Sequence, residues 1–255
     1  MNDQRTQGAL LLAVGATALF LSFSDLTLSY VRAGLRPLLG VAGAILLGLG
    51  LLSVLQGRRQ AAGGEDEDWH DHDGGHGPRV AWLLVLPVLV LLLVEPPALG
   101  SFAALRQSSL TLAGGDGNFP PLARATGGAV PVGLSEFVDR ALFDKQHSLA
   151  GQRVRVFGFV MPEKQGSYRL ARFVMYCCAA DAEVVEIVVR GDPTPRQPDQ
   201  WVTVEGRWLA PGPGPGAAPN TVSDGHGGRL PVLAAETVTV TSPPRDRYEH
   251  SIYGV

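Results

Sequence analysis

Three long apolar runs fill most of the first hundred residues and constrain the fold of this chain more than any other feature. The runs are Gly8 to Tyr30, Leu35 to Leu55 and Val80 to Leu99. A helix needs about 20 apolar residues to cross the roughly 30 Å hydrocarbon core of a bilayer, and each run approaches or meets that length. The sequence therefore predicts an α-helical N-terminal part with three transmembrane helices in a lipid bilayer of the cell membrane.

The first two runs are predicted to form a helical hairpin within residues 1–55. Only Tyr30–Pro37 separates them, and the first run is longer than a secretory signal and lacks a small-x-small cleavage site. Asp25 lies near the end of the first run. Its carboxylate either faces protein or water at membrane depth or reaches the lipid headgroups.

Glycines recur along the second run, at positions 40, 43, 48 and 50. Small residues allow the backbones of two helices to approach closely in lipid, where packing drives their association. Glycine is also simply common in transmembrane helices. Both interpretations stay open at the level of sequence.

Basic residues beside the runs predict the orientation of the chain in the membrane. With the N-terminus in the cytoplasm, the inside segments hold four arginines and the outside segments three. The inside residues are Arg5, Arg58, Arg59 and Arg79, and the outside residues are Arg32, Arg36 and Arg106. This margin predicts an extracellular C-terminal domain.

A polar linker at residues 56–79 connects the hairpin to the third run at 80–99. It is rich in glycine, His70 and His72 alternate there with Asp71 and Asp73, and His76 follows three residues later. Imidazole and carboxylate groups together suit divalent cations such as Zn²⁺ or Cu²⁺. The alternative is a solvated acidic loop whose histidines bind nothing specific.

After the third run, residues 100–133 are rich in glycine and proline and predict a flexible tether without clear secondary structure. Residues 134–144 then show apolar spacing of three and four, which predicts a helix capped by Ser135. Beyond this helix the period changes to two, beginning at Arg153.

Five strands are predicted in the remainder, the first at 153–160 and the others at 167–176, 183–190, 201–209 and 230–241. Gly158 lies inside the first strand, where it permits a sharp bend. Short, strongly curved strands favour an all-β, OB-like small barrel over residues 134–255. OB folds often bind nucleic acid, but residues 105–255 hold 15 basic and 15 acidic residues, so we expect no nucleic-acid partner.

Two adjacent cysteines, the only ones in the chain, carry the most specific chemistry. Cys177 and Cys178 lie where the second strand is predicted to end, and Asp181 follows closely. Two thiolates at one turn suit a soft or borderline ion such as Cu(I) or Zn²⁺, with Asp181 as a third ligand. A thiol of lowered pKa would instead exchange with the disulfide of a partner. A third interpretation is that one cysteine packs in the barrel and the other has no role.

The linker histidines and the cysteine pair are expected to act as separate sites. With three membrane spans, the linker and the C-terminal domain lie on opposite sides of the bilayer. The sequence contains no nucleophile–base–orienter set, no phosphate-binding loop and no HExxH motif, so we expect a protein that is not an enzyme.

The chain resembles the YcgQ-type bacterial membrane proteins along nearly its whole length. The resemblance rests on the first hairpin, the His/Asp-rich linker, the third run and three segments of the C-terminal domain. These segments read AGQRVRVFGFV, YRLARFVMYCCAADA and WVTVEGRW.

The resemblance implies that the protein is one subunit of a permease, paired with a YcgR-type multi-span permease. Its motif maps onto Cys177, Cys178, Ala180 and Asp181, and onto the nearby Arg172. The leading hypothesis is therefore an accessory permease subunit whose cysteine pair captures or hands over a soft metal ion. A membrane-tethered thiol redox protein and a purely structural scaffold are the alternatives.

Overall fold

The computed structural model describes residues 2–62, 98–107, 117–122, 128–163, 167–210 and 220–249. The chain divides into two compact units, Met1–Pro97 and Ala98–Val255. Most of the predicted third span (residues 80–97), together with His70, His72 and His76, lies outside the described residues.

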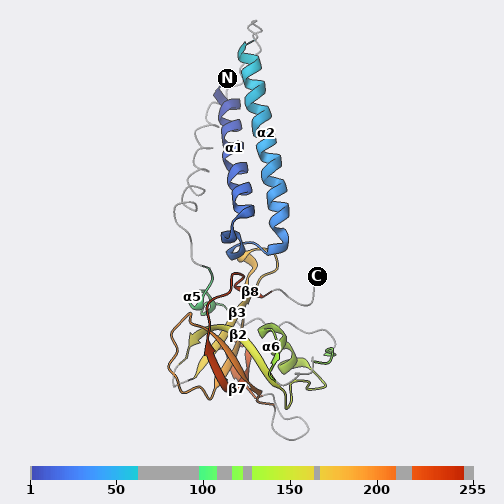
Figure 1. Ribbon diagram of the computed structural model, residues 1–255, viewed down its shortest axis with the longest axis vertical. Helices are drawn as coiled ribbons and strands as arrows, with labels where there is room; N and C mark the ends of the chain where they lie inside the picture. The colour runs from blue at the N-terminus through green and yellow to red at the C-terminus, as the bar shows by residue number, and fades with distance from the viewer. Residues whose placement is uncertain are drawn as a thin grey trace. The chain divides into compact units, whose positions relative to one another are not determined.

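The first unit contains two long helices that lie side by side (Figure 1). These are α1 (Asn2–Phe23) and α2 (Arg36–Ala62), joined by the 3-10 turns η1 (Asp25–Ser29) and η2 (Ala33–Leu35). Among the described residues, one helix is long and apolar enough to cross a membrane, at Ala33–Gln56. The apolar part of α1, Gln7–Phe23, is shorter than the predicted span to Tyr30, because the helix gives way to η1 at polar residues.

Glycines bring α1 and α2 into close contact. A Cβ atom at Gly43 would lie 2.8 Å from the backbone nitrogen of Leu19, and one at Gly15 would lie 2.9 Å from the carbonyl oxygen of Gly43. Gly8 and Gly50 form a similar contact seven residues away on each helix. The close approach is therefore present at Gly43 and Gly50, whereas no atom of the described residues lies within 4 Å of a Cβ built at Gly48.

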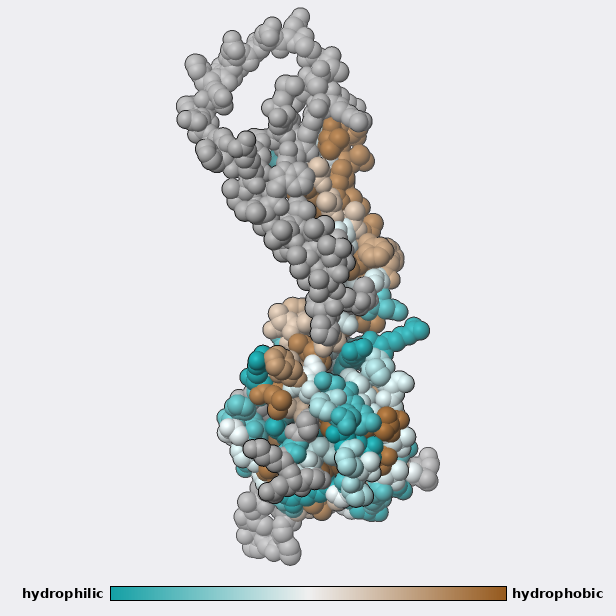
Figure 2. Space-filling view, turned by 90° about the vertical axis from the view of Figure 1, so that its left-hand side faces the viewer, coloured by the Kyte–Doolittle hydropathy of each residue, from teal (hydrophilic) through white to brown (hydrophobic). Residues whose placement is uncertain are grey.

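The turn between the helices places Asp25 at the end of the hairpin. Its side chain is 70% exposed and lies 4.0 Å from the guanidinium of Arg36. Arg36 also donates to the carbonyl oxygens of Ser22 and Ser24, at the end of α1. Asp25 is therefore exposed at the turn and lies near a basic side chain, while its place relative to the lipid headgroups stays a prediction. On the face that Figure 2 shows, the part of the hairpin that no grey atoms cover is mainly apolar.

The second unit is a β-barrel-like domain preceded by a helix (Figure 1). Five strands form the barrel in the order β2-β5-β7-β4-β3, and β3 pairs again with β2 to close it. Their bounds are β2 (Arg153–Pro162), β3 (Tyr168–Val174), β4 (Glu183–Arg190), β5 (Trp201–Trp208) and β7 (Arg229–Val240). All five lie where the period-two pattern predicted strands. The short strands β1 (Val130–Pro131), β6 (Thr221–Ser223) and β8 (Tyr248–Glu249) pair with β2, β7 and β3.

Closure of the barrel depends on a bend in β2. The strand pairs with β5 from Arg153 to Phe159 and with β3 from Phe159 to Pro162. A Cβ atom at Gly158 would lie 2.6 Å from the carbonyl oxygen of Ala171 in β3. Only glycine therefore fits at this crossing, where the close approach of β3 adds a reason to the bend that the sequence predicted.

Helix α6 (Leu134–Phe143) packs on the barrel and covers its main core. The prediction that Ser135 caps the N-terminus of this helix is wrong, because the helix begins at Leu134 and Ser135 lies inside it. The carboxylate of Glu249 instead accepts the backbone N–H groups of Leu134 (2.7 Å) and Ser135 (2.9 Å). Arg172 pairs with the same carboxylate at 3.2 Å. A capping residue more than a hundred positions away leaves no local signal in the sequence.

The predicted tether at 100–133 contains two ordered elements among its described residues, α5 (Ser101–Ala104) and β1. The carboxylate of Asp199 accepts hydrogen bonds from the backbone nitrogen and the hydroxyl of Ser101, at 2.6 and 2.9 Å. Ala104 is fully buried in a second core cluster with Phe173 and Trp201. Glycine and proline content therefore misled the prediction, because tertiary contacts fix this short helix.

Candidate functional site

The candidate site is the loop between β3 and β4, which carries both cysteines. Strand β3 ends at Val174, the backbone then turns through Tyr176, and η4 (Ala179–Asp181) leads into β4. Cys177 is exposed, Cys178 is partly buried, and both are free thiols. The prediction that the pair lies at the end of a strand is confirmed.

The carboxylate of Asp181 organises this loop. It accepts backbone N–H groups from Tyr176 at 3.1 Å, Cys177 at 2.8 Å and Cys178 at 3.3 Å. The backbone nitrogen of Asp181 in turn donates to the carbonyl oxygen of Cys178 at 3.0 Å. Partial burial would raise the pKa of Asp181, but hydrogen bonds from the Cys177 thiol and from these amides lower it. Asp181 therefore stays ionised and holds the two cysteines at one tight turn.

The two thiols point toward each other, with their Sγ atoms 3.7 Å apart. Hydrogen bonds to the Asp181 carboxylate and to the Cys178 thiol raise the pKa of Cys177 to about 12. A carboxylate beside a thiol disfavours a second negative charge. Without a bound cation, the Cys177 thiol is therefore protonated at neutral pH.

Cys177, Cys178 and Asp181 together form a set of three metal-ligating groups. One ligand atom of each residue lies within 4.8 Å of the other two. The loop is open to solvent at Cys177 and backed by packed side chains, because Tyr176 lies against the main core and Ala179 against the second cluster. An incoming ion would thus meet two sulfur atoms and a carboxylate that are already gathered together.

The side chain of Gln107 ties this site to the segment that enters the domain. Its amide group donates to the carbonyl oxygen of Ala182 at 3.4 Å and accepts the N–H of Val184 at 3.2 Å. Ala182 follows Asp181 directly, and Val184 lies three residues beyond Asp181. The loop and the segment that carries α5 are therefore neighbours.

Arg172, which the resemblance singles out with the cysteines, is not part of the thiol loop. It points toward β8, where it pairs with Glu249 and donates to the carbonyl oxygen of Tyr248 at 3.0 Å. There it borders a cavity of about 310 Å³, whose other lining residues include Arg155, Phe157 and Thr203. Burial lowers the pKa of Arg172 against the opposing effect of Glu249. Its role in the described structure is to join β3, β8 and α6.

Asp139 is an unusual residue that the sequence did not point out. It lies in α6 with 1% of its surface exposed, and neither carboxylate oxygen has a hydrogen-bond partner among the described residues. Burial, and to a lesser extent the charge of Glu136, raises the pKa of Asp139 to about 7. A single acidic residue in an amphipathic helix carries no local signal that it is buried.

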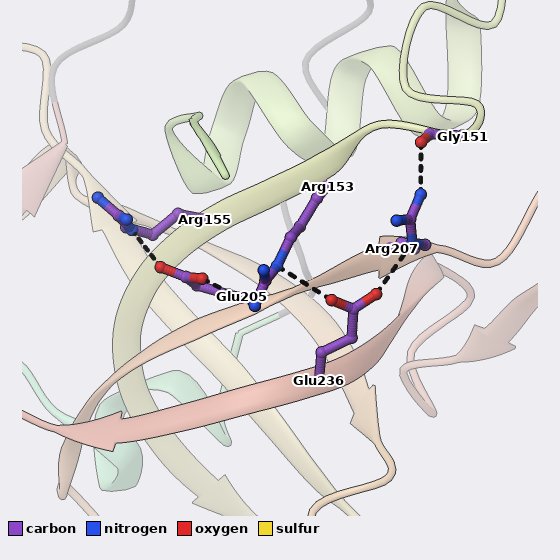
Figure 3. A network of polar contacts seen from close by, with 6 residues as sticks. All are labelled: Gly151, Arg153, Arg155, Glu205, Arg207 and Glu236. Atoms are coloured by element: carbon purple, nitrogen blue, oxygen red, sulfur yellow. Dashed lines mark hydrogen bonds and ion pairs between the residues drawn. The ribbon is translucent and has the colours of Figure 1, made fainter. Parts of the chain in front are cut away.

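A ladder of charged residues crosses the outer surface of β2, β5 and β7 (Figure 3). Glu205 pairs with Arg155 at 2.7 Å and with Arg153 at 3.2 Å. Glu236 pairs with Arg153 at 3.0 Å and with Arg207 at 2.9 Å. Because each arginine faces a carboxylate, this ladder is a set of surface ion pairs and not a cationic binding groove.

Residues 138–250 match the family model described as the DUF1980 C-terminal domain. This family is bacterial and poorly characterised. The match runs from within α6 to the residue after β8, so it contains the thiol loop, Arg172 and Glu249. No curated protein matches the chain.

Proposed function

We propose that this protein is a non-enzymatic accessory subunit of a membrane permease. Its residues 138–250 match the DUF1980 C-terminal domain. In this proposal the barrel captures or hands over a soft or borderline metal ion through Cys177 and Cys178. The observation that carries it is the gathering of two thiols and the Asp181 carboxylate within 4.8 Å of one another.

The spacing of the thiols favours one coordination geometry. Two sulfur ligands at about 2.3 Å from a tetrahedral Zn²⁺ lie about 3.8 Å apart, whereas ligands at that distance on opposite sides of a linear ion lie about 4.6 Å apart. The observed separation of 3.7 Å suits the tetrahedral case. We therefore propose Zn²⁺ as the better fit to this conformation, and Cu(I) as an ion that requires the side chains to rotate.

The site leaves room for exchange of its ion. Cys177, Cys178 and Asp181 supply three ligands, and a tetrahedral ion needs a fourth, which water or a ligand from a partner would provide. Ions held by a closed set of four protein ligands serve structural roles, while an open position permits transfer. Binding would also displace the Cys177 proton, so that capture is coupled to proton release.

The membrane part of the proposal extends beyond the candidate span Ala33–Gln56. We propose that α1, α2 and the apolar run at 80–97 all cross the bilayer and that the barrel is OB-like and extracellular. The support is the five-stranded barrel itself, since the OB fold is a small barrel of five strands. The resemblance to YcgQ-type proteins supplies the partner, a YcgR-type multi-span permease. His70, His72 and His76 would form a second, weaker metal site on the other side of the membrane.

Thiol–disulfide exchange is the less favoured function for this loop. An attacking cysteine works as a thiolate, which needs a pKa near or below the ambient pH. Hydrogen bonding to Asp181 raises the pKa of Cys177 to about 12, which opposes such a role. If a Cys178→Ser variant nevertheless traps a mixed disulfide with a partner, the redox function replaces metal capture.

Metal titration of the full-length protein in detergent tests the proposal. Replacing His70, His72 and His76 with alanine first removes the linker ligands, so that Zn²⁺ competition with a chromophoric chelator reports only the barrel. We expect one equivalent of Zn²⁺ in this background and none after Cys177→Ser and Cys178→Ser are added. Equal binding with and without the two thiols would overturn metal capture by this loop.

Affinity purification from native membranes tests the proposed partnership separately. We expect a multi-span permease to co-purify with the tagged protein in mild detergent, and to do so equally with the variant that lacks both thiols. Recovery of the protein alone would contradict the accessory-subunit proposal, whatever the metal titration shows. Loss of the permease only in the thiol variant would place the cysteines in the interface.

A further inference from the structure

The segment around α5 exposes apolar side chains on a domain that otherwise buries them. Among the described residues of Ala98–Val255, the exposed large apolar side chains are Phe102 (67%), Val240 (53%) and Leu105 (48%). Two of these three lie within four residues of one another. In Figure 2 the described surface of the domain is mainly hydrophilic, with a few apolar patches. Grouped apolar side chains of this kind mark a surface that contacts something other than water.

This segment is fixed to the barrel at both ends. At the start of the segment, the carboxylate of Asp199 accepts two hydrogen bonds from Ser101. At its end, Gln107 forms hydrogen bonds with Ala182 and Val184, where β4 begins. Between them Ala104 is fully buried in the second core cluster. Phe102 and Leu105 are thus presented outward on a held element, and cannot be attributed to a loose chain end.

A positive charge lies directly beside the apolar side chains. The guanidinium carbon of Arg106 is 3.8 Å from the centre of the Phe102 ring. An aromatic ring with a cation at its face suits the boundary between acyl chains and headgroups, where the ring meets hydrocarbon and the guanidinium meets phosphate. Aromatic and basic residues beside apolar ones are typical of segments that lie in this boundary.

The chain also keeps α5 close to the end of an apolar run. The run at Val80–Leu99 ends two residues before α5 begins. Five residues join Pro97 to Phe102, and a fully extended chain of that length reaches at most about 18 Å. A bilayer surface at the end of this run would therefore always lie within reach of Phe102.

We propose that α5 and the turn after it rest on the lipid bilayer, with Phe102 and Leu105 at the headgroup–acyl boundary and Arg106 on anionic headgroups. This inference rests on the membrane span at residues 80–97 in the proposed function and is independent of metal binding. Gln107 contacts Ala182, which lies four residues beyond Cys178. Contact through α5 thus holds the thiol loop close to the membrane surface, where the mouth of a permease would lie.

Fluorescence quenching by labelled lipids tests this contact in the full chain. Cys177→Ser and Cys178→Ser remove all native thiols, and Phe102→Cys, Leu105→Cys or Gln152→Cys then supplies a single site for an environment-sensitive dye. Gln152 is the matched control, because it is exposed and precedes β2, whereas α5 packs near the opposite end of that strand. Each protein is placed in nanodiscs of phosphatidylcholine and phosphatidylglycerol that contain a headgroup nitroxide.

We expect the nitroxide to quench the dye at positions 102 and 105 at least threefold more than the dye at 152. Equal quenching at the three positions would overturn the proposal. So would a dye at 102 that is shielded from aqueous iodide in native membranes but exposed in nanodiscs, because a protein partner would then cover α5. All these proteins lack the thiols, so either result leaves metal capture untouched.

Discussion

At the scale of single residues, the central feature is one carboxylate that serves three backbone amides. Asp181 binds the N–H groups of Tyr176, Cys177 and Cys178 and so fixes the turn on which both thiols lie. The same carboxylate is close enough to ligate an ion. Asp181 is therefore both the residue that shapes the loop and the third member of the ligand set.

Replacing Asp181 with asparagine is expected to weaken Zn²⁺ binding at least tenfold without unfolding the barrel. The amide keeps the size of the side chain but removes its charge, and it offers only one acceptor oxygen to the loop. Chelator competition measures the affinity, and the thermal midpoint serves as the folding control. An unchanged affinity would show that Asp181 neither ligates the ion nor orders the thiols.

Asp139 predicts a dependence of stability on pH. Because burial raises its pKa to about 7, the folded state binds this proton more tightly than the unfolded state. Protonation therefore favours folding, and this contribution is lost as pH rises from about 4 through about 7. We expect Asp139→Asn to stabilise the domain by about 2 kcal/mol at pH 8 and by clearly less at pH 5, where most of the loss between pH 4 and pH 7 has not yet occurred.

Thermal unfolding at the two pH values measures this effect. Equal stabilisation at pH 5 and pH 8 would show that ionisation of Asp139 is not its cause. Loss of stability at both values would show that the carboxylate makes contacts that an amide cannot replace.

At the scale of elements, long-range contacts complete structures that the sequence only outlines. The five barrel strands and α6 could be predicted because their period of two or of three and four is a local property. The cap of α6 could not, because it comes from Glu249 in β8. Likewise, α5 was predicted to be part of a flexible tether, because the hydrogen bonds of Ser101 to Asp199 and of Gln107 to Ala182 join residues far apart in the sequence.

The buried pair of Glu249 and Arg172 should matter far more than the exposed surface ladder. Replacing Glu249 with alanine leaves two helix N–H groups without their cap and leaves Arg172 buried without its counter-charge. We expect a loss of about 3–5 kcal/mol. Glu236→Ala is the matched control, because it removes a carboxylate that pairs with two arginines on the surface, at a cost of about 1 kcal/mol or less.

Denaturant unfolding of the two variants gives the comparison. The expected order is a large loss of stability for Glu249→Ala and a small one for Glu236→Ala. Similar losses would contradict the view that Glu249 joins β8, β3 and α6.

The helical hairpin predicts different effects for two neighbouring glycines. A Cβ at Gly43 would collide with the backbone of α1, whereas a Cβ at Gly48 would meet no atom of the part of the chain that the structure describes. We expect Gly43→Val to push the helices apart by several ångströms and Gly48→Val to leave them in place. Nitroxide labels at Val14 and Leu49, both exposed, report the distance between the helices. Equal separations in the two variants would contradict the packing described here.

At the scale of the whole molecule, the sequence marks a membrane part, a barrel and a cysteine pair, but not how these are connected in function. The candidate ligands could be named from the sequence because two adjacent thiols and a carboxylate lie within five residues of the chain. Their geometry could not, since it depends on how the loop folds back through Asp181. The link from the thiol loop through Gln107 to α5 likewise arises only from the tertiary fold.

The proposed connection makes the thiol loop a metal site near the membrane surface that serves a transport partner. Its chemical core is coordination by both cysteines, on which the capture and transfer of an ion depend. The identity of the partner and the direction of transfer are separate questions, which arise only if both cysteines bind the ion.

X-ray absorption spectroscopy of the Zn²⁺-loaded protein tests this claim most directly. In the background without His70, His72 and His76, we predict two sulfur atoms at about 2.3 Å from the metal and the remaining ligands at about 2.0–2.2 Å from oxygen or nitrogen. A first shell without sulfur would contradict it, because the ion would then be bound elsewhere and the paired cysteines would have another role.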